Sequence, residues 1–240
     1  GYNGPSLKTT DGGKTWQNIY QPPAGSYVYD IVAPTENTIY QREYSSSSRS
    51  RLLKSFDGGT TWSYITPAVN NLVSSFQFLD AFNGYFAGDG GRMYATIDGG
   101  STWNEIYRSP YGDMSAMYFL NRTTGFAQSG TKILSTTTGG VTWDTVANNF
   151  YSAIKLKFVN NSIGYAISGY PYYFGKTTNG GASWTFFSGN NYWDFEAVDA
   201  DNIFVLNYYG TVSHSTNGGT SFTTIPDAGV YPQRIDLINN

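Results

Sequence analysis

The segment Thr96–Trp103 reads Thr-Ile-Asp-Gly-Gly-Ser-Thr-Trp and is one of six similar segments in a chain of 240 residues. The closing aromatic residues of successive copies lie 46, 41, 40, 41 and 38 residues apart. Self-similarity at a period of about 20–50 residues indicates a repeat architecture. The other copies are Thr9–Trp16, Ser55–Trp62, Thr136–Trp143, Thr177–Trp184 and Ser215–Phe222.

A second motif lies between successive copies and predicts a second hairpin in each period. Its best example is Phe76–Leu79 followed by Gly84–Ala87. Within 76–106, alternating apolar residues and Gly-rich turns predict four short strands, with turns at 80–83, 89–91 and 98–100. Four antiparallel strands per 40 residues is typical of a β-propeller blade. Similar pairs occur at Met117–Leu120 with Gly125–Ala127, and at Leu156–Val159 with Gly164–Ala166.

The two ends of the chain match consecutive parts of one repeat. Residues 234–240 resemble 155–161 in pattern, and Gly1-Tyr2 resembles the Gly164-Tyr165 that follows. We therefore predict one all-β domain, 1–240, that forms a six-bladed β-propeller with four antiparallel strands per blade. A C-terminal strand is expected to complete the N-terminal blade, which leaves no exposed sheet edge. The expected blades are 231–240 with 1–20, 27–65, 74–106, 113–146, 153–187 and 194–225.

The repeated segment is expected to form a turn that is held closed by side-chain hydrogen bonds and by packing of its last aromatic residue. The Asp or Asn side chain is expected to accept backbone N–H groups two residues on, and the closing aromatic to pack between sheets. A threonine can cap only weakly, so the fourth turn is expected to be the loosest. These residues are Asp11, Trp16, Asp57, Trp62, Asp98, Trp103, Thr138, Trp143, Asn179, Trp184, Asn217 and Phe222.

The repeat resembles the Asp-box, or bacterial neuraminidase repeat, across the whole chain. The Asp-Gly-Gly-x-Thr-Trp spelling is most similar to propellers of the photosystem II assembly factor and sortilin type, and to secreted bacterial propellers. The resemblance implies that the repeated turns join third and fourth strands on the face opposite the ligand. Sialidases of this family use three arginines, one in an Arg-Ile-Pro segment, and no such segment occurs here. We expect no enzyme activity.

Composition excludes several other classes of function. Seventeen Asp and Glu outnumber 14 Lys and Arg, so a basic stripe for nucleic acid is not expected. The chain has no Cys and one His, which excludes disulfides, thiolate catalysis and multi-His metal sites. We expect no cofactor, no metal and no membrane insertion, and the polar, cysteine-free composition favours a secreted or cell-surface bacterial protein.

Aromatic residues gather in the loops expected opposite the repeated turns. Rings beside Asn, Asp and Ser suit a glycan or a protein partner. The alternative is that individual rings only fill space between blades. The candidate ligand-binding residues are Tyr107, Tyr111, Tyr151, Tyr170, Tyr172, Tyr173, Tyr192, Trp193, Tyr208 and Tyr209.

Two other functional readings stay open. An assembly factor for a membrane protein complex would need an arginine patch, for which six arginines between Arg42 and Arg122 are available. A degenerate sialidase-like glycosidase is the third candidate function.

His214 is expected to face solvent on a strand. Charges on the first strands are expected to line a central channel, where their mixed signs favour either pairing with one another or a water-filled tunnel, and ligand contact is the weaker alternative. These residues are Asp30, Lys155, Lys157, Glu196 and Asp236.

Overall fold

The computed structural model describes residues 5–11, 14–45, 49–65, 73–148, 150, 153–168, 173–187, 191–207 and 209–225. In this described part, all regular structure is β-strand except one 3-10 turn, η1 (Asp89–Gly91). The chain divides into unit 1, Gly1–Arg108, and unit 2, Ser109–Asn240. The all-β class expected from the sequence is confirmed.

Unit 1 holds three antiparallel sheets, and the strands of each follow one another along the chain. The first sheet has two strands and the other two have four. The strands are β1 (Ser6–Lys8) and β2 (Gln17–Tyr20); β3 (Ser26–Val32), β4 (Ile39–Ser45), β5 (Arg49–Ser55) and β6 (Ser63–Tyr64); and β7 (Val73–Phe78), β8 (Gly84–Gly88), β9 (Arg92–Thr96) and β10 (Asn104–Arg108).

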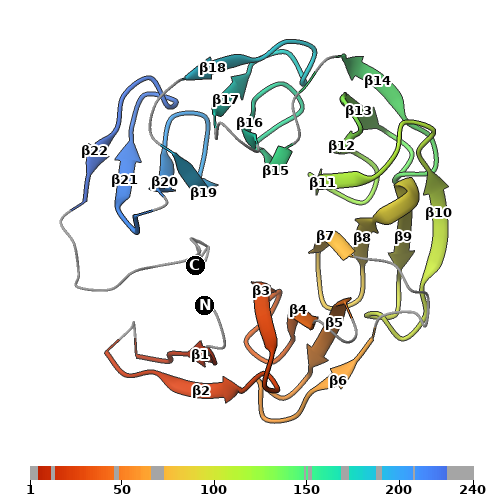
Figure 1. Cartoon of the computed structure of the whole chain (residues 1–240), viewed down its shortest axis with the longest axis vertical. Coiled ribbons are helices and arrows are strands. Elements are labelled where there is room, and N and C mark those ends of the chain that lie inside the picture. Colours follow the sequence, from red (N-terminus) through yellow and green to blue (C-terminus); the bar gives the residue numbers. More distant parts are fainter. Residues whose placement is uncertain are drawn as a thin grey trace. The chain divides into compact units, whose positions relative to one another are not determined.

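Unit 2 holds three four-stranded sheets of the same topology. In Figure 1 the first strands β11, β15 and β19 lie on one side of the unit, and the fourth strands lie on the other. The strands are β11 (Met114–Phe119), β12 (Gly125–Ser129), β13 (Lys132–Thr136) and β14 (Asp144–Ala147); β15 (Ala153–Phe158), β16 (Gly164–Ser168), β17 (Phe174–Thr177) and β18 (Thr185–Phe187); and β19 (Tyr192–Ala197), β20 (Ile203–Asn207), β21 (Val212–Ser215) and β22 (Thr223–Thr224).

The prediction of six blades is wrong, because the described part of the chain forms five four-stranded sheets. Six repeated turns guarantee only six pairs of strands, since each turn joins two consecutive antiparallel strands. Five of these pairs continue a preceding hairpin, whereas β1 and β2 pair only with each other among the described residues. The segment 231–240, predicted to complete the first blade, lies outside the described residues.

The second motif is explained by a ring that packs on a glycine. Phe78 ends β7 and pairs in register with Gly84, which begins β8. A Cβ placed on Gly84 would lie 2.5 Å from the Phe78 ring, so a larger side chain at this position would displace the ring. The same pairing joins Phe119 with Gly125 and Phe158 with Gly164.

The core lies between neighbouring sheets rather than in one central cluster. In unit 1, Leu52 of β5 packs with Val73, Phe86 and Tyr94 of the next sheet. In unit 2, one cluster joins the sheets β11–β14 and β15–β18, and another joins β15–β18 and β19–β22. Second strands such as β8, β12 and β16 are buried along their whole length.

Candidate binding surface

Strand order separates two ends on every four-stranded sheet. The turns between strands one and two and between strands three and four share one end, here called the clasp end. The hairpin between strands two and three and the connection to the next sheet share the other, here called the loop end. The repeated turns therefore lie opposite the candidate loops within each sheet, as the sequence predicted.

The repeated turn is fastened by an aspartate, as Asp98 shows. Its Oδ1 accepts the backbone N–H of Thr102 at 2.9 Å, and its Oδ2 accepts the Thr102 hydroxyl at 2.6 Å. The Thr96 hydroxyl donates to Asp98 Oδ1 at 2.8 Å and accepts the Gly100 N–H at 2.9 Å. The capping bond thus spans four residues, and the prediction of a two-residue span was wrong. Closing the longer turn requires Gly99 and Gly100 at φ 67° and 85°.

The same bonds keep the turn aspartates ionised. The side-chain and backbone hydrogen bonds from Thr102 lower the pKa of Asp98 to about 2. Bonds from Thr61 and Thr15 do the same for Asp57 and Asp11. Carboxylates with such low pKa values and filled acceptor sites are suited to capping rather than to proton transfer.

The fourth turn keeps the cap with a threonine in place of the acid, but two of its bonds are longer than their equivalents, as expected of the loosest turn. Thr136 Oγ1 lies 3.3 Å from Thr138 Oγ1 and accepts the Gly140 N–H at 3.1 Å, against 2.8 and 2.9 Å in the turn of Asp98. Thr138 Oγ1 accepts the Thr142 N–H at 2.9 Å and lies 2.8 Å from the Thr142 hydroxyl. Asn179 and Asn217 also keep the cap, with their Oδ1 atoms accepting N–H groups at 2.9 and 3.0 Å.

The closing indoles tie one sheet to the next. Trp103 Nε1 donates to the Ile65 carbonyl at 2.7 Å, and its ring packs edge-on against Phe86. Trp62 Nε1 donates to the Ile19 carbonyl at 2.8 Å. These indoles are half-buried, whereas Trp16 is 58% exposed. The predicted position between sheets is confirmed for Trp62 and Trp103.

At the loop end of unit 2, the ring of Tyr111 lies beside a lysine. Tyr111 is 43% exposed, and Lys132 Nζ lies 5.3 Å from its ring centroid. The Thr145 hydroxyl donates to Tyr111 Oη at 3.3 Å, and Lys132 also donates to the side-chain oxygen of Asn148. We call these four residues the Tyr111 surface. It combines an aromatic face, an ammonium group and an amide.

A second exposed ring lies at the loop end of the sheet β19–β22. Tyr209 is 71% exposed in the hairpin between β20 and β21. Asn207 Oδ1 fixes this hairpin by accepting the N–H groups of Tyr209 at 3.0 Å and Thr211 at 2.9 Å. The ring is therefore presented to solvent from a turn with a defined conformation.

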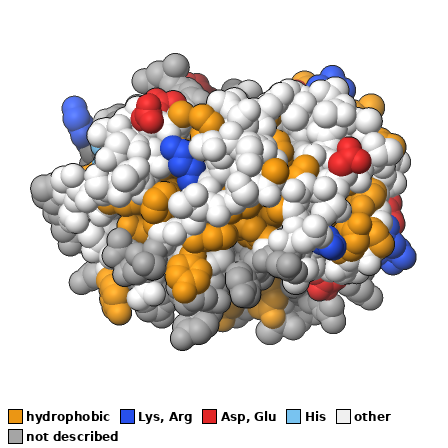
Figure 2. Space-filling view, turned by 90° about the horizontal axis from the view of Figure 1, so that it is seen from above, with side chains coloured by type: hydrophobic (Ala, Val, Ile, Leu, Met, Phe, Trp, Pro, Cys, Tyr) orange, Lys and Arg blue, Asp and Glu red, His pale blue; other side chains and the backbone are white. Residues whose placement is uncertain are grey.

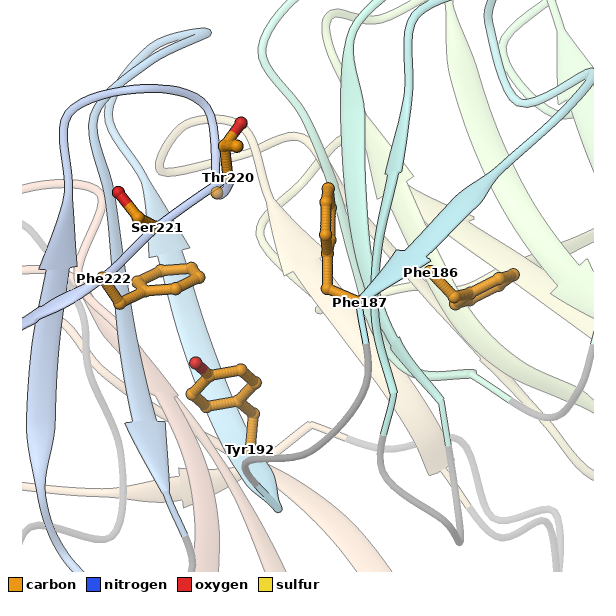
Figure 3. Close-up of a pocket in the computed structure, with 7 residues that line it drawn as sticks. Phe186, Phe187, Tyr192, Thr220, Ser221 and Phe222 are labelled. Carbon is orange, nitrogen blue, oxygen red and sulfur yellow. The ribbon is translucent and has the colours of Figure 1, made fainter.

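Other predicted ligand residues divide into buried and half-buried rings. Tyr192 is 6% exposed and packs against Phe222 and Phe174, so it fills space between sheets (Figure 3). Tyr107, Tyr173 and Trp193 are half-buried. The structure therefore exposes Tyr111 and Tyr209 but does not present all the described candidates as one exposed cluster. Tyr151, Tyr170, Tyr172 and Tyr208 lie outside the described residues.

Charges on the first strands of unit 2 pair with one another, which was one of the alternatives expected from the sequence. Lys155 Nζ on β15 lies 2.8 Å from Asp194 Oδ1 and 3.6 Å from Glu196 Oε2, both on β19. Lys157 also forms an ion pair with Glu196. The acids are buried and the lysines are partly exposed, so these pairs join two sheets. Asp236 lies outside the described residues.

Unit 1 contains a buried carboxylate that the sequence did not reveal. Glu43 on β4 has no exposed surface and pairs with Arg51 at 2.5 Å. The hydroxyl of Tyr20, from β2, donates to its other oxygen, and the Tyr64 hydroxyl lies 3.4 Å from Oε1. Burial and the bond to Glu43 raise the pKa of Tyr20. Glu43 thus links the two-stranded sheet to its neighbour.

Most of the arginines considered for a docking patch form ion pairs within unit 1. Arg42 pairs with Asp30 at 2.5 Å and also donates to the Val73 and Ser74 carbonyls. Arg92 and Arg108 both pair with Glu105, at 3.8 and 3.3 Å. Since Arg51 pairs with Glu43, four of the six arginines already have carboxylate partners.

The single histidine is not solvent-facing. His214 is half-buried on β21, and its ring stacks on Phe204 with centroids 4.2 Å apart.

No cluster of three or more potential metal-ligating residues occurs in the described part of the chain. Within that part, no helix has the length and hydropathy of a membrane span. On the face shown in Figure 2, hydrophobic side chains reach the surface and charged ones are sparse.

Solved structures share this fold at low sequence identity. YCF48 bound to a D1 peptide has a TM-score of 0.56 and 16% identity, covering 84% of this chain and 83% of that chain. YCF48 from Cyanidioschyzon merolae has a TM-score of 0.60 and 15% identity, covering 85% and 87%. The GH74 enzyme of Niastella koreensis has a TM-score of 0.59 and 17% identity, covering 82% of this chain but 38% of that enzyme.

These likenesses show that the chain has a β-propeller fold, and at such identities they show the fold alone. No family model and no curated protein matches the sequence. The name Asp-box for the repeated turn therefore stays a prediction, although the hydrogen bonds of the turn are described above.

Proposed function

We propose that the protein is a non-catalytic binding propeller whose loop end in unit 2 engages a protein partner. The observation that carries this proposal is the Tyr111 surface, where a solvent-exposed ring, the Lys132 ammonium and the Asn148 amide lie together. An aromatic face suits an apolar side chain, and an ammonium group suits a carboxylate. The partner segment would present an apolar residue beside an acidic one.

The solved structures add support to a protein partner. YCF48 has been solved with a D1 peptide bound, so this fold accommodates a peptide in that protein. For the present chain, assembly of a membrane protein complex is a second candidate function. The internal pairing of Arg42, Arg51, Arg92 and Arg108 does not favour it, because paired guanidinium groups are less available to a partner.

A glycan is the alternative ligand for the exposed rings, since Tyr111 and Tyr209 could stack on the apolar face of a sugar. The proposal includes secretion or cell-surface display in a bacterium, which the polar, cysteine-free composition supports. Fractionation of the source cells with an antibody against the protein tests this location.

A displayed peptide library and a glycan array, both probed with the intact protein, test the function. We expect selected peptides to combine apolar and acidic residues. We expect Tyr111→Ala and Lys132→Met to weaken their binding at least tenfold. Phe82→Ala and Ile97→Ala are matched controls, because these exposed residues lie at the clasp end of the sheet β7–β10.

Peptide binding that the Tyr111 and Lys132 variants leave unchanged would contradict the proposed surface. Glycan binding without peptide binding would favour the alternative ligand. Turnover of a panel of fluorogenic glycosides would contradict the non-catalytic assignment.

A further inference from the structure

A pocket lies between the last two sheets of unit 2, on a different part of the unit from the Tyr111 surface. Its cavity has a volume of about 450 Å³, within the usual range of about 300–1,000 Å³ for small-molecule sites. Figure 3 shows it between β18 and the turn that leads into β22. Its lining residues are Phe186, Phe187, Tyr192, Gly219, Thr220, Ser221 and Phe222.

The pocket coincides with a departure from the repeat. The closing aromatic is Trp in five copies and Phe222 in the last. In three of the other copies the indole N–H donates to the carbonyl of the glycine three residues earlier, at 3.0 Å for Trp62, 2.9 Å for Trp143 and 3.0 Å for Trp184. Gly219 is the equivalent glycine and lines the pocket, but Phe222 has no N–H to donate.

The facing wall departs from the repeat as well. Three residues after the closing aromatic, the chain has aliphatic Ile19, Ile65 and Val146, but Phe187 follows Trp184 at the same spacing. In Figure 3 the Phe187 ring points toward the gap and Phe186 points away from it. Aromatic rings therefore border the pocket from both sheets.

The base of this aromatic group is rigidly packed. Phe174 is fully buried and contacts Phe187, Tyr192 and Phe222, with centroid distances of 6.3, 5.9 and 5.8 Å. Asn217 fixes the turn above it, because its Oδ1 accepts the Ser221 N–H at 3.0 Å and its Nδ2 donates to the Ser221 hydroxyl at 2.8 Å.

We propose that this pocket binds an indole ring, which packs against Phe187 and Phe222 and donates its N–H to the Gly219 carbonyl. The ligand would supply the donor that three other copies carry within the chain. Two sources share this chemistry: a free indole-class molecule and the tryptophan side chain of a peptide. The proposal does not depend on the Tyr111 surface, because the lining residues of the two do not overlap.

Ligand-observed NMR titration of the whole chain with indole and with N-acetyltryptophanamide tests the proposal and distinguishes the sources. Saturable binding of indole supports the site, and equal or tighter binding of the amide assigns it to a side chain. We expect 1-methylindole, which has no N–H, to bind at least fivefold more weakly than indole. Equal binding of 1-methylindole would overturn the role of the Gly219 carbonyl.

Two variants test the location. Phe222→Trp restores the indole of the other copies and should abolish binding by filling the pocket. Phe82→Trp is the matched control, because Phe82 is 59% exposed in unit 1, and it should leave binding unchanged. Phe187→Ile, which introduces the aliphatic residue of the other copies, should weaken binding at least fivefold and provides a second test if Phe222→Trp does not fold.

The proposal would be overturned if neither indole nor the amide bound to the wild-type chain. It would also be overturned if folded Phe222→Trp, or folded Phe187→Ile, bound indole as tightly as the wild type does. Circular dichroism of each variant establishes that it is folded before titration.

Discussion

Lys54 Nζ lies 2.6 Å from the carbonyl oxygen of Gly99 and joins the sheet β3–β6 to the repeated turn of the next sheet. The side chain is buried, and the ammonium lies 3.3 Å from the centroid of Phe56. Lys8 and Lys176, which also precede the Ser or Thr of a repeat, donate to the carbonyls of Glu36 and Ala200 at 2.9 and 3.4 Å. Lysine at this position is therefore a recurring contact between sheets.

Replacing this contact should destabilise unit 1. We expect Lys54→Met to lower the free energy of unfolding by about 2 kcal/mol, the usual scale for a buried hydrogen bond to a charged group. Lys176→Met should cost less, because its bond is longer and its side chain is only half-buried. Urea denaturation followed by tryptophan fluorescence measures both values. An equal cost for the two variants would contradict the ranking.

The repeated turns should make the protein sensitive to acid. Asp57 and Asp98 have folded-state pKa values of about 2, below their ordinary value of 3.8. A carboxyl group with a lowered pKa stabilises the fold above its unfolded pKa, and that stabilisation is lost as pH falls through the folded value. We therefore expect the free energy of unfolding to decrease from about pH 4 to about pH 2.

Natural asparagines in the same position provide the control for this acid sensitivity. Asn179 and Asn217 make the cap without a titrating group. Asp57→Asn with Asp98→Asn should keep the fold and flatten the loss of stability between about pH 4 and pH 2. Asn179→Asp should steepen it. If the wild type, the variant with both Asp57→Asn and Asp98→Asn, and Asn179→Asp lost the same stability between about pH 4 and pH 2, the turn aspartates would not cause the acid sensitivity.

The closing indoles should differ in their contribution to stability. We expect Trp103→Ala to cost about 3 kcal/mol, because it removes packing against Phe78 and Phe86 and the bond to Ile65. Trp16→Ala should cost less than about 1 kcal/mol, because that ring is 58% exposed. Thermal unfolding compares them, and an unchanged Tm for Trp103→Ala would show that its contacts do not stabilise the fold.

The buried Glu43 should be sensitive to loss of charge. Glu43→Leu leaves the Tyr20 hydroxyl without its acceptor and the partly exposed Arg51 without its carboxylate, and should cost about 1–3 kcal/mol, the range for leaving a buried polar group unsatisfied. Glu43→Gln should cost less, because its amide oxygen can still accept the Tyr20 hydroxyl. Glu43→Leu combined with Arg51→Met should recover part of the loss. If the costs of Glu43→Leu and Arg51→Met, measured by denaturation, simply added in the double variant, the coupling between Glu43 and Arg51 would be contradicted.

The sequence predicted the repeated turn because its chemistry is local. The bonds of Asp98 reach only to residues 96–102, so spacing and residue type reveal them. The number of four-stranded sheets was predicted wrongly because it depends on pairing between distant segments. One turn, Thr9–Trp16, is flanked by only two paired strands in the described part of the chain.

The candidate site was predicted only in part, because a sequence shows that a loop holds a ring but not where the ring points. Tyr111 and Tyr209 are exposed, whereas Tyr192 is the first residue of β19 and packs inward on Phe222. Two signals in the sequence could have revealed more. Lysine recurs at residues 8, 54 and 176, and the change from Trp to Phe222 coincides with Phe187 opposite it.

The two-stranded sheet β1–β2 has too little structure to persist alone. Its attachment to the next sheet runs through side-chain contacts of both strands. Tyr20 bonds to Glu43, and the Ile19 carbonyl accepts Trp62 Nε1. Ser6 donates to Gln41, and Lys8 donates to the Glu36 carbonyl. Amide hydrogens of Gln17–Tyr20 should therefore exchange at a rate set by local opening of these contacts. That opening would precede unfolding of the sheet β3–β6. Native-state hydrogen exchange should therefore identify the sheet β1–β2 as the first part of unit 1 to detach.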